Sequence, residues 1–310
     1  RVRKEIMDIL LGLVVNILEE GLIYGVMAMG VYITYKILDF PDLSVDGTFP
    51  LGACVTAVLI TLGVNPWLAC LGAFACGAAA GCVTGLLHVK LHISDLLSGI
   101  LVMTGLYSIN LLITGGQATV QFYNKPTIFT AGPAALLPAG MRTWRVTVVA
   151  LVTVVIVKLL LDAYLRTKSG LLLRATGSNA QYVISLGRDP GKMKILGLAI
   201  GNGCAAMSGG LLSQQTETAN IASGTGMMVM ALASVIIGTS LFRRVRFVKA
   251  TAAVVLGSIL YKTCLVVAMQ LGLPTNLLKL LMAVLFTVAL VSNNLVSKRR
   301  KKQYVDPVQL

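Results

Sequence analysis

The chain has 310 residues, of which 56% are hydrophobic and only 12% are charged. Soluble domains carry about 25% charged residues, so this composition excludes an ordinary soluble domain. The formal net charge of +14 does not indicate nucleic acid, because the basic residues lie at the ends of apolar runs, where they orient membrane spans.

Repeated apolar runs of roughly 18 to 22 residues predict an all-α polytopic membrane protein with about eight to nine transmembrane helices. We expect residues 1–16 to form an amphipathic lead-in, or an extension of the first span, and residues 17–297 to form one transmembrane domain. A basic tail follows at 298–310. The predicted spans are 17–36, 47–62, 66–87, 95–114, 146–165, 192–213, 226–242, 250–271 and 275–295.

Lysine and arginine predict the orientation, because cytoplasmic loops carry an excess of both. If nine spans are counted, one side holds the basic segments 88–94, 166–194, 243–249 and 298–302. We therefore expect a multi-pass protein of the cell (inner) membrane with a cytoplasmic C-terminus, whose basic tail contacts membrane lipids. The N-terminus is then outside, which conflicts with the three basic residues near it, because such residues favour the cytoplasmic side.

The predicted outer segment 115–145 is rich in Gly, Pro and Thr, which predicts a loop with a short hairpin or helix rather than a span. It suits either an external cap that receives another protein or a plain connector.

The first break in the apolar pattern is "KILDFPDLSVDGTFPLG", residues 36–52. Pro41 ends one helix, and a following acid or serine can cap the next. Irregular backbone at membrane depth is tolerated only inside protein or along a water-filled path, where a half-helix N-terminus offers free N–H groups to a polar solute. The alternative is a cytoplasmic turn with capping acids. The polar candidates for the path are Asp42, Ser44, Asp46 and Thr48.

The second break is "SQQTETANIASGTG", residues 213–226, and it contains Glu217. The two breaks follow spans of opposite predicted orientation in opposite halves of the chain. This pattern is typical of inverted repeats around a central path.

Three polar residues lie inside predicted spans. Asn110 and Asn202 are further candidates for the path, although bridging between helices is the commoner role of such amides. Lys262 is either a functional group or a lysine that snorkels or pairs at a subunit interface.

The segment 166–192 crosses no membrane in this prediction and contains a helical pattern from Asn179 to Leu186. Ser178 or Asn179 caps it and Gly187 stops it. The helix would project the apolar or amphipathic side chains Tyr182, Val183 and Leu186 into a cleft on a cytoplasmic partner.

Two stretches carry a resemblance to a known family. "LRATGSNAQYVISLGRDPGKMKILGLAIGNGCAAMSGGLLSQ" resembles the coupling-loop region of permeases of branched-chain amino acid and ribose ABC importers, and "LDFPDLSVDGTFPLGA" resembles that family's motif G-I-D-L-S-V-G. The variant here, with Asp46 before Gly47, argues against sugar specificity. It looks closest to permeases paired with lipoprotein-type binding proteins of the aromatic amino acid type.

The resemblance implies a subunit that works as a pair of identical copies, with two cytoplasmic ATPase subunits and an external substrate-binding protein. The 179–186 helix would sit in the ATPase groove. Because the sequence has no G-x-x-x-x-G-K-[ST], ATP and Mg²⁺ belong on the separate ATPase, and we expect this chain to bind no cofactor.

The leading hypothesis is therefore the permease subunit of an ATP-driven importer for an aromatic or branched-chain amino acid. The alternatives are a nucleoside or sugar permease of the same type, and a secondary transporter that uses Asp46 and Glu217 as ion relays. We expect neither catalysis nor a metal site, because His88 and His92 share one loop without a third ligand.

Overall fold

The structure is a computed structural model that describes residues 2–131, 144–242, 247–274 and 277–305. In these ranges seven helical segments are long and apolar enough to cross a membrane, and two shorter apolar helices accompany them. The prediction of an all-α polytopic membrane protein is confirmed, and each of the nine predicted spans coincides with a helix. The corresponding helices are α1 (Val2–Val31) with η1 (Tyr32–Ile37), α2 (Val45–Thr61), α3 (Pro66–Leu91), α4 (Asp95–Ile113), α5 (Arg145–Tyr164), α8 (Pro190–Thr216), α9 (Met227–Leu241), α10 (Ala250–Gln270) and α11 (Leu278–Val305).

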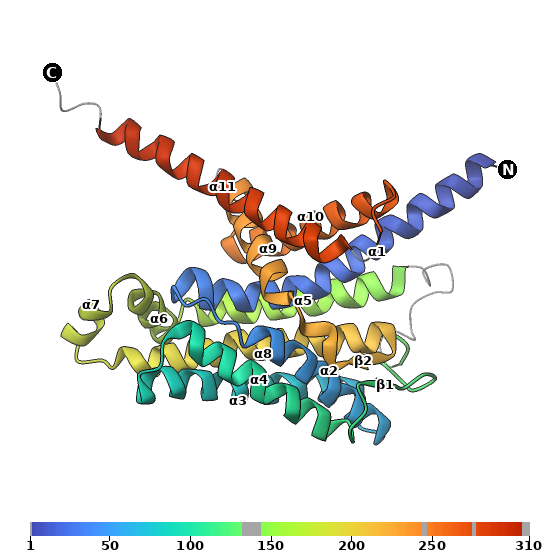
Figure 1. Cartoon of the computed structure of the whole chain (residues 1–310), viewed down its shortest axis with the longest axis horizontal. Helices are drawn as coiled ribbons and strands as arrows, with labels where there is room; N and C mark the ends of the chain where they lie inside the picture. The colour runs from blue at the N-terminus through green and yellow to red at the C-terminus, as the bar shows by residue number, and fades with distance from the viewer. Residues whose placement is uncertain (1, 132–143, 243–246, 275–276, 306–310) are drawn as a thin grey trace.

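The ends of the chain extend from the helical body. Residues 2–16 belong to α1, so of the two expectations for this segment the structure gives the extension of the first predicted span. In Figure 1 the beginning of α1 and the end of α11 diverge from the packed helices. The side chains of the predicted basic tail, 298–310, lie outside the described residues, as do Arg243, Arg244 and Arg246 of the basic segment 243–249.

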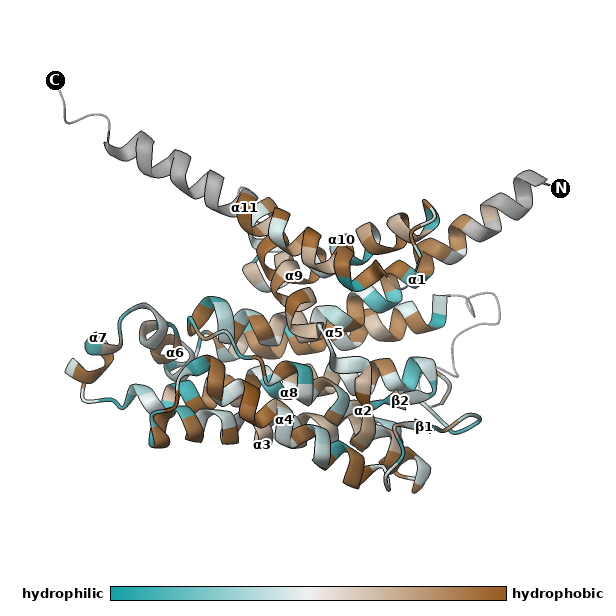
Figure 2. Ribbon diagram, viewed as in Figure 1, coloured by the Kyte–Doolittle hydropathy of each residue, from teal (hydrophilic) through white to brown (hydrophobic). Residues whose placement is uncertain are grey.

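The body is organised around α8, which packs along α3 and α2 and also contacts α1. Small residues allow this close approach: a Cβ at Gly52 of α2 or at Gly81 of α3 would overlap backbone atoms of α8. In Figure 2 brown, apolar residues recur along the ribbons of the helices. Membrane helices gain little hydrophobic free energy by associating, because lipid is as apolar as their side chains. Close van der Waals packing at small residues stabilises their association instead.

The two ends of the body carry different structures (Figure 1). Helices α6 (Lys168–Ser178) and α7 (Ala180–Ser185) lie at one end. At the other end β1 (Thr119–Gln121) pairs antiparallel with β2 (Thr218–Asn220). The predicted outer segment 115–145 thus forms no local hairpin in its described part, but a strand shared with the segment after α8. The N-terminus lies toward the strand end and the C-terminus toward the α7 end (Figure 1).

The outer segment also packs on the body. Its side chains Phe122, Ile128 and Phe129 are buried, and the Ile128 N–H donates to Gln214 Oε1 of α8 over 2.9 Å. In its described residues the segment therefore covers the ends of the helices; residues 132–143 lie outside the description.

Both predicted breaks are present. After η1 the chain is non-helical from Leu38 to Ser44, and α2 begins beside the middle of α8, at the level of Asn202. After α8 the chain passes through β2 and η4 (Ile221–Gly224), and α9 begins beside Asp46. Helix α2 runs toward the strands, which it contacts, and α9 runs toward η1. This arrangement agrees with inverted repeats, which remain a prediction.

Gly52→Ala tests the α2–α8 packing. We expect it to lower the free energy of unfolding by about 1–3 kcal/mol, the usual cost of overpacking a tight core. Gly105→Ala on α4 is the matched control, because a Cβ there meets nothing within 4 Å and alanine is the better helix former. Thermal unfolding in detergent measures both variants, and equal midpoints would contradict this packing.

Candidate functional site

The first break is held by a buried network of hydrogen bonds. Asn202 Nδ2 donates to Asp42 Oδ2 over 2.6 Å, and Asn202 Oδ1 lies within reach of the hydroxyls of Ser44 (3.0 Å) and Thr48 (2.9 Å). The Ser44 N–H donates to Asp42 Oδ1 over 2.9 Å. All four side chains are fully buried. The network joins the non-helical segment and the first turn of α2 to the middle of α8.

The carboxyl group of Asp42 forms no ion pair with a cation in the described ranges. Its oxygens instead accept from the Ser44 N–H, the Ser44 hydroxyl and the Asn202 amide. A buried polar group is tolerated when it is hydrogen-bonded in this way, so the network fixes the break rather than offering an open binding surface. The sequence prediction of a bridging role for Asn202 is confirmed by these contacts.

Asp46 connects the two broken helices. It lies in the first turn of α2, and its carboxylate accepts the N–H of Gly226 over 3.0 Å and the N–H of Met228 over 2.6 Å. These donors belong to the N-terminal end of α9, where Gly226 has φ +89°. One carboxylate therefore lies at the positive ends of two helix dipoles and satisfies N–H groups that a helix leaves unpaired.

A cavity of about 320 Å³ lies beside Asp46. It is bounded by α2, α4 and the segment before α9. Its polar lining consists of one carboxylate, one amide and several hydroxyl groups, and the remaining lining is small or apolar. The lining residues are Asp46, Gly47, Pro50, Met103, Thr104, Tyr107, Asn110, Ile221, Ala222 and Thr225.

Of the seven residues predicted for a path, the structure brings Asp46 and Asn110 to this cavity. Asn110 is buried, and its amide donates to the Gly47 carbonyl over 3.3 Å, so it also bridges α4 to α2. Asp42, Ser44, Thr48 and Asn202 do not line the cavity but form the buried network.

Glu217 lies elsewhere. It is the left-handed C-cap of α8, with φ +53°, and its carbonyl accepts the Phe122 N–H over 3.0 Å. It does not line the cavity at Asp46. Within the described residues, therefore, the structure does not bring the two proposed relay carboxylates into one site.

Sequence reasoning identified Asn110 of α4 but missed the other α4 residues that line the cavity, Met103, Thr104 and Tyr107. Thr104, Tyr107 and Ser108 are exposed in the middle of this span, at the spacing of one helix face. A stripe of polar residues at positions 104, 107 and 108 within an apolar span was a usable signal.

Lys262 has a partner within the same chain. Its ammonium forms an ion pair with Glu20 of α1 and lies 6.0 Å from the centroid of the Tyr24 ring. The lysine and glutamate side chains are only 13% and 21% exposed. The ion pair therefore explains Lys262 without a snorkelling side chain or a subunit interface.

At the opposite end, α7 closely matches its prediction. Asn179 caps it by accepting the N–H groups of Gln181 and Tyr182 over 3.0 and 3.2 Å, and Gly187 follows with φ +70°. Ser178 belongs instead to the end of α6, where its hydroxyl donates to the Arg174 carbonyl. Helix α6 was not predicted.

The prediction that Val183 of α7 contacts a cytoplasmic partner is wrong. Val183 is fully buried in its own chain, so it cannot project into a partner. The exposed apolar side chains here are Tyr182, Ile184 and Leu186, at 56%, 59% and 52% exposure. The helical period turns Val183 toward the body and leaves its neighbours outside.

Comparison with known proteins decides the family. Residues 13–290 match the family described as "Branched-chain amino acid transport system / permease component". The chain belongs to this family. The resemblance inferred from the two sequence motifs is thereby confirmed, and the chain is a permease component of a transport system.

Several relatives are similar over most of the chain. The tyrosine transport system permease protein of Clostridioides difficile (strain R20291) is 42% identical over 282 residues, covering 91% of this chain and 92% of that protein. The fructose import permease protein FruF of Bifidobacterium longum is 26% identical, covering 74% and 63%. The ribose import permease protein RbsC of Escherichia coli (strain K12) is 24% identical, covering 72% and 68%. No solved structure matches the chain significantly.

The ion pair between Lys262 and Glu20 predicts strong coupling between the two residues. We expect Lys262→Met alone to lower the free energy of unfolding by about 1–3 kcal/mol, because it leaves a partly buried carboxylate unpaired. The double variant Lys262→Met/Glu20→Gln should regain most of this loss. Thermal unfolding in detergent measures the cycle. Losses that simply add would show that the pair is not coupled.

Proposed function

We propose that this chain is the membrane-spanning permease of an ATP-driven importer for an amino acid, and that the cavity beside Asp46 lies on the path of the solute. The observation that carries the proposal is the convergence of two half-helix N-termini on one carboxylate at the edge of a partly polar cavity. Such broken helices bind charged solute groups at membrane depth in other transporters.

The lining suits an amino acid with an aromatic or large apolar side chain. A carboxylate retains acceptor sites beyond the two N–H groups that Asp46 already accepts, so it can receive an ammonium group. Tyr107 and Met103 supply an aromatic ring and an apolar surface. The 42% identity with a tyrosine transport permease supports the same class of solute.

The proposed machine contains two copies of this chain, two ATPase subunits that carry ATP and Mg²⁺, and an external binding protein. The exposed polar stripe on α4 supports a second, identical copy across the path, because polar groups at membrane depth rarely face lipid. The exposed apolar residues of α7 support an ATPase groove at that end, which is then cytoplasmic, together with the C-terminus. The outer segment 115–145 would receive the binding protein.

A sugar is the second candidate, since the more distant relatives include fructose and ribose permeases. The higher identity to the tyrosine permease and the position of Asp46 favour the amino acid. Uptake by the reconstituted complex, with the two solutes in competition and with or without ATP, tests this choice. An ion-coupled transporter would instead show uptake that survives ATP depletion and stops with an ionophore.

Asp46→Asn tests the path. The amide can still accept an N–H from α9, but the negative charge is lost. We expect uptake to fall about tenfold or more, because a hydrogen bond to a charged group contributes about 1.5–3 kcal/mol. Uptake is expressed per assembled complex, because the asparagine NH2 group replaces one of the two oxygens that accept N–H groups from α9. Asp95→Asn, the first-turn acid of α4, is the matched control and should transport normally. Full uptake by Asp46→Asn would remove this cavity from the path.

Leu186→Asp tests the ATPase surface. We expect the variant to insert and fold but to lose the co-purifying ATPase, because a charge replaces an apolar contact in the groove. Tyr123→Asp, at the strand end and similarly exposed at 55%, should retain the ATPase. Val183→Asp is unsuitable, since it would bury a charge within the chain. Normal recovery of ATPase with Leu186→Asp would refute the docking role of α7.

A further inference from the structure

A second polar cavity, of about 330 Å³, lies at the α7 end of the body and shares no lining residue with the cavity at Asp46. It is bounded by the π-helix η1, the last turns of α9 and the start of α10. Short π-helical segments are uncommon and frequently occur at functional sites. Here η1 presents Tyr32, Tyr35 and Lys36 to the cavity, opposite Val235, Ile236, Thr239, Ser240 and Ala250.

The η1 side of this cavity offers donors without partners. Tyr32 is nine-tenths buried, yet its hydroxyl has no hydrogen-bond partner within the described ranges. Lys36 is exposed and forms no ion pair with any residue that the structure describes. The free hydroxyl of a largely buried tyrosine and an unpaired ammonium in one cavity indicate a ligand with acceptor atoms and negative charge.

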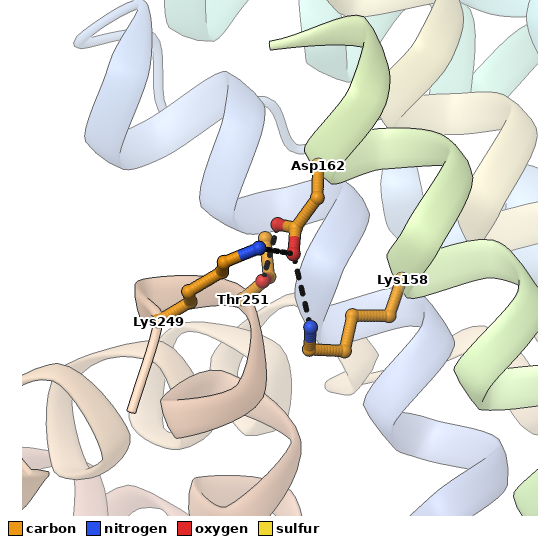
Figure 3. A network of polar contacts seen from close by, with 4 residues as sticks. All are labelled: Lys158, Asp162, Lys249 and Thr251. Carbon is orange, nitrogen blue, oxygen red and sulfur yellow. Dashed lines mark hydrogen bonds and ion pairs between the residues drawn. The ribbon is translucent and has the colours of Figure 1, made fainter. Parts of the chain in front are cut away.

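The neighbouring acid does not neutralise this charge. Asp162 is already occupied by the ammonium groups of Lys158 and Lys249, at 2.9 and 3.2 Å, and by the Thr251 hydroxyl at 2.7 Å (Figure 3). Arg174 and Asp162 both lie close enough to Tyr32 to act on it electrostatically, with opposite signs, so the lysines around them leave an excess of positive charge. The surroundings of the cavity therefore remain positive.

The start of α10 adds to this field. Ala250 lines the cavity as the first residue of a 21-residue helix, and the N-cap residue Lys249 provides no side-chain acceptor for the free N–H groups. Positive helix ends favour anions, and the contacts of Lys249 and Thr251 with Asp162 hold this end in place (Figure 3).

The cavity also lies where spans meet the membrane surface. It is formed at the ends of the segments Leu10–Ile37 and Ile221–Leu241 and at the beginning of Ala250–Gln270. Lysine and tyrosine are characteristic of that depth. Leu241 and Phe247, which lie in sequence between the cavity residues Ser240 and Ala250, are 62% and 98% exposed.

We propose that this cavity binds the phosphate headgroup of an anionic phospholipid, with Lys36, the Tyr32 hydroxyl and the start of α10 as its donors. Basic pockets between membrane helices on the cytoplasmic side hold such headgroups. The net positive surroundings favour a phosphate over an amino acid, which carries an ammonium as well as a carboxylate. The site is separate from the proposed solute cavity, so the two proposals can fail independently.

Native mass spectrometry tests the proposal on the full chain after incorporation into phosphatidylcholine vesicles with or without phosphatidylglycerol. The parent chain should retain phosphatidylglycerol selectively after extraction into detergent. Lys36→Gln should weaken this retention about fivefold, the factor that corresponds to about 1 kcal/mol for a lysine near an anionic membrane surface. Tyr32→Phe, which keeps the ring and removes only the hydroxyl, should also weaken it.

Lys90→Gln, an exposed lysine in the last turn of α3, is the matched control and should retain the lipid like the parent. Equal retention by Lys36→Gln and the parent would overturn the proposal. Displacement of the lipid by millimolar tyrosine would make the cavity a solute site instead. Displacement of the lipid by millimolar inorganic phosphate would identify a free anion as the ligand and would also overturn the phospholipid proposal.

Discussion

The hydrogen bonds from the start of α9 to the Asp46 carboxylate are the interaction on which the rest of this membrane protein depends. A chain that interrupts two helices at membrane depth must satisfy the free N–H groups within the protein. Asp46 does so for α9 while it occupies the first turn of α2. These hydrogen bonds join the two breaks, so the position of the start of α9 depends on the position of the start of α2.

This arrangement requires a rigid frame, and α8 provides it. Its small residues let α2 and α3 approach until their backbones touch. Asn202, in the middle of α8, then fixes the non-helical segment through Asp42, Ser44 and Thr48. Close backbone packing and a satisfied polar network together hold the first turn of α2 in position, so that Asp46 meets both α9 and the cavity.

The sequence allowed the spans, the two breaks and helix α7 to be predicted, because each depends on local chemistry. Long apolar runs identify spans, Pro41 ends a helix, and Asn179 with Gly187 delimits α7. What it could not provide was the direction in which side chains point after packing. Val183 and Leu186 look alike in sequence, but one is buried and the other exposed.

The same limit explains the errors at the site. The strand pairing of 119–121 with 218–220 joins segments about one hundred residues apart, and no local pattern predicts it. Glu217 and Asp46 are both acids within broken segments, and only the fold shows that one caps α8 while the other lines the cavity. The polar stripe on α4 was visible, but only the fold shows that Thr104 and Tyr107 line a cavity together with Asp46.

Aqueous access to the Asp46 cavity is the most direct test of this account. Thr104→Cys, in the cavity, and Ile109→Cys, on α4 outside it, would each be placed in a chain whose six native cysteines are replaced. A charged thiol reagent should modify Thr104→Cys, more slowly when the transported solute is present, and should leave Ile109→Cys unmodified. Equal modification of both, unaffected by solute, would show that the solute does not pass beside Asp46.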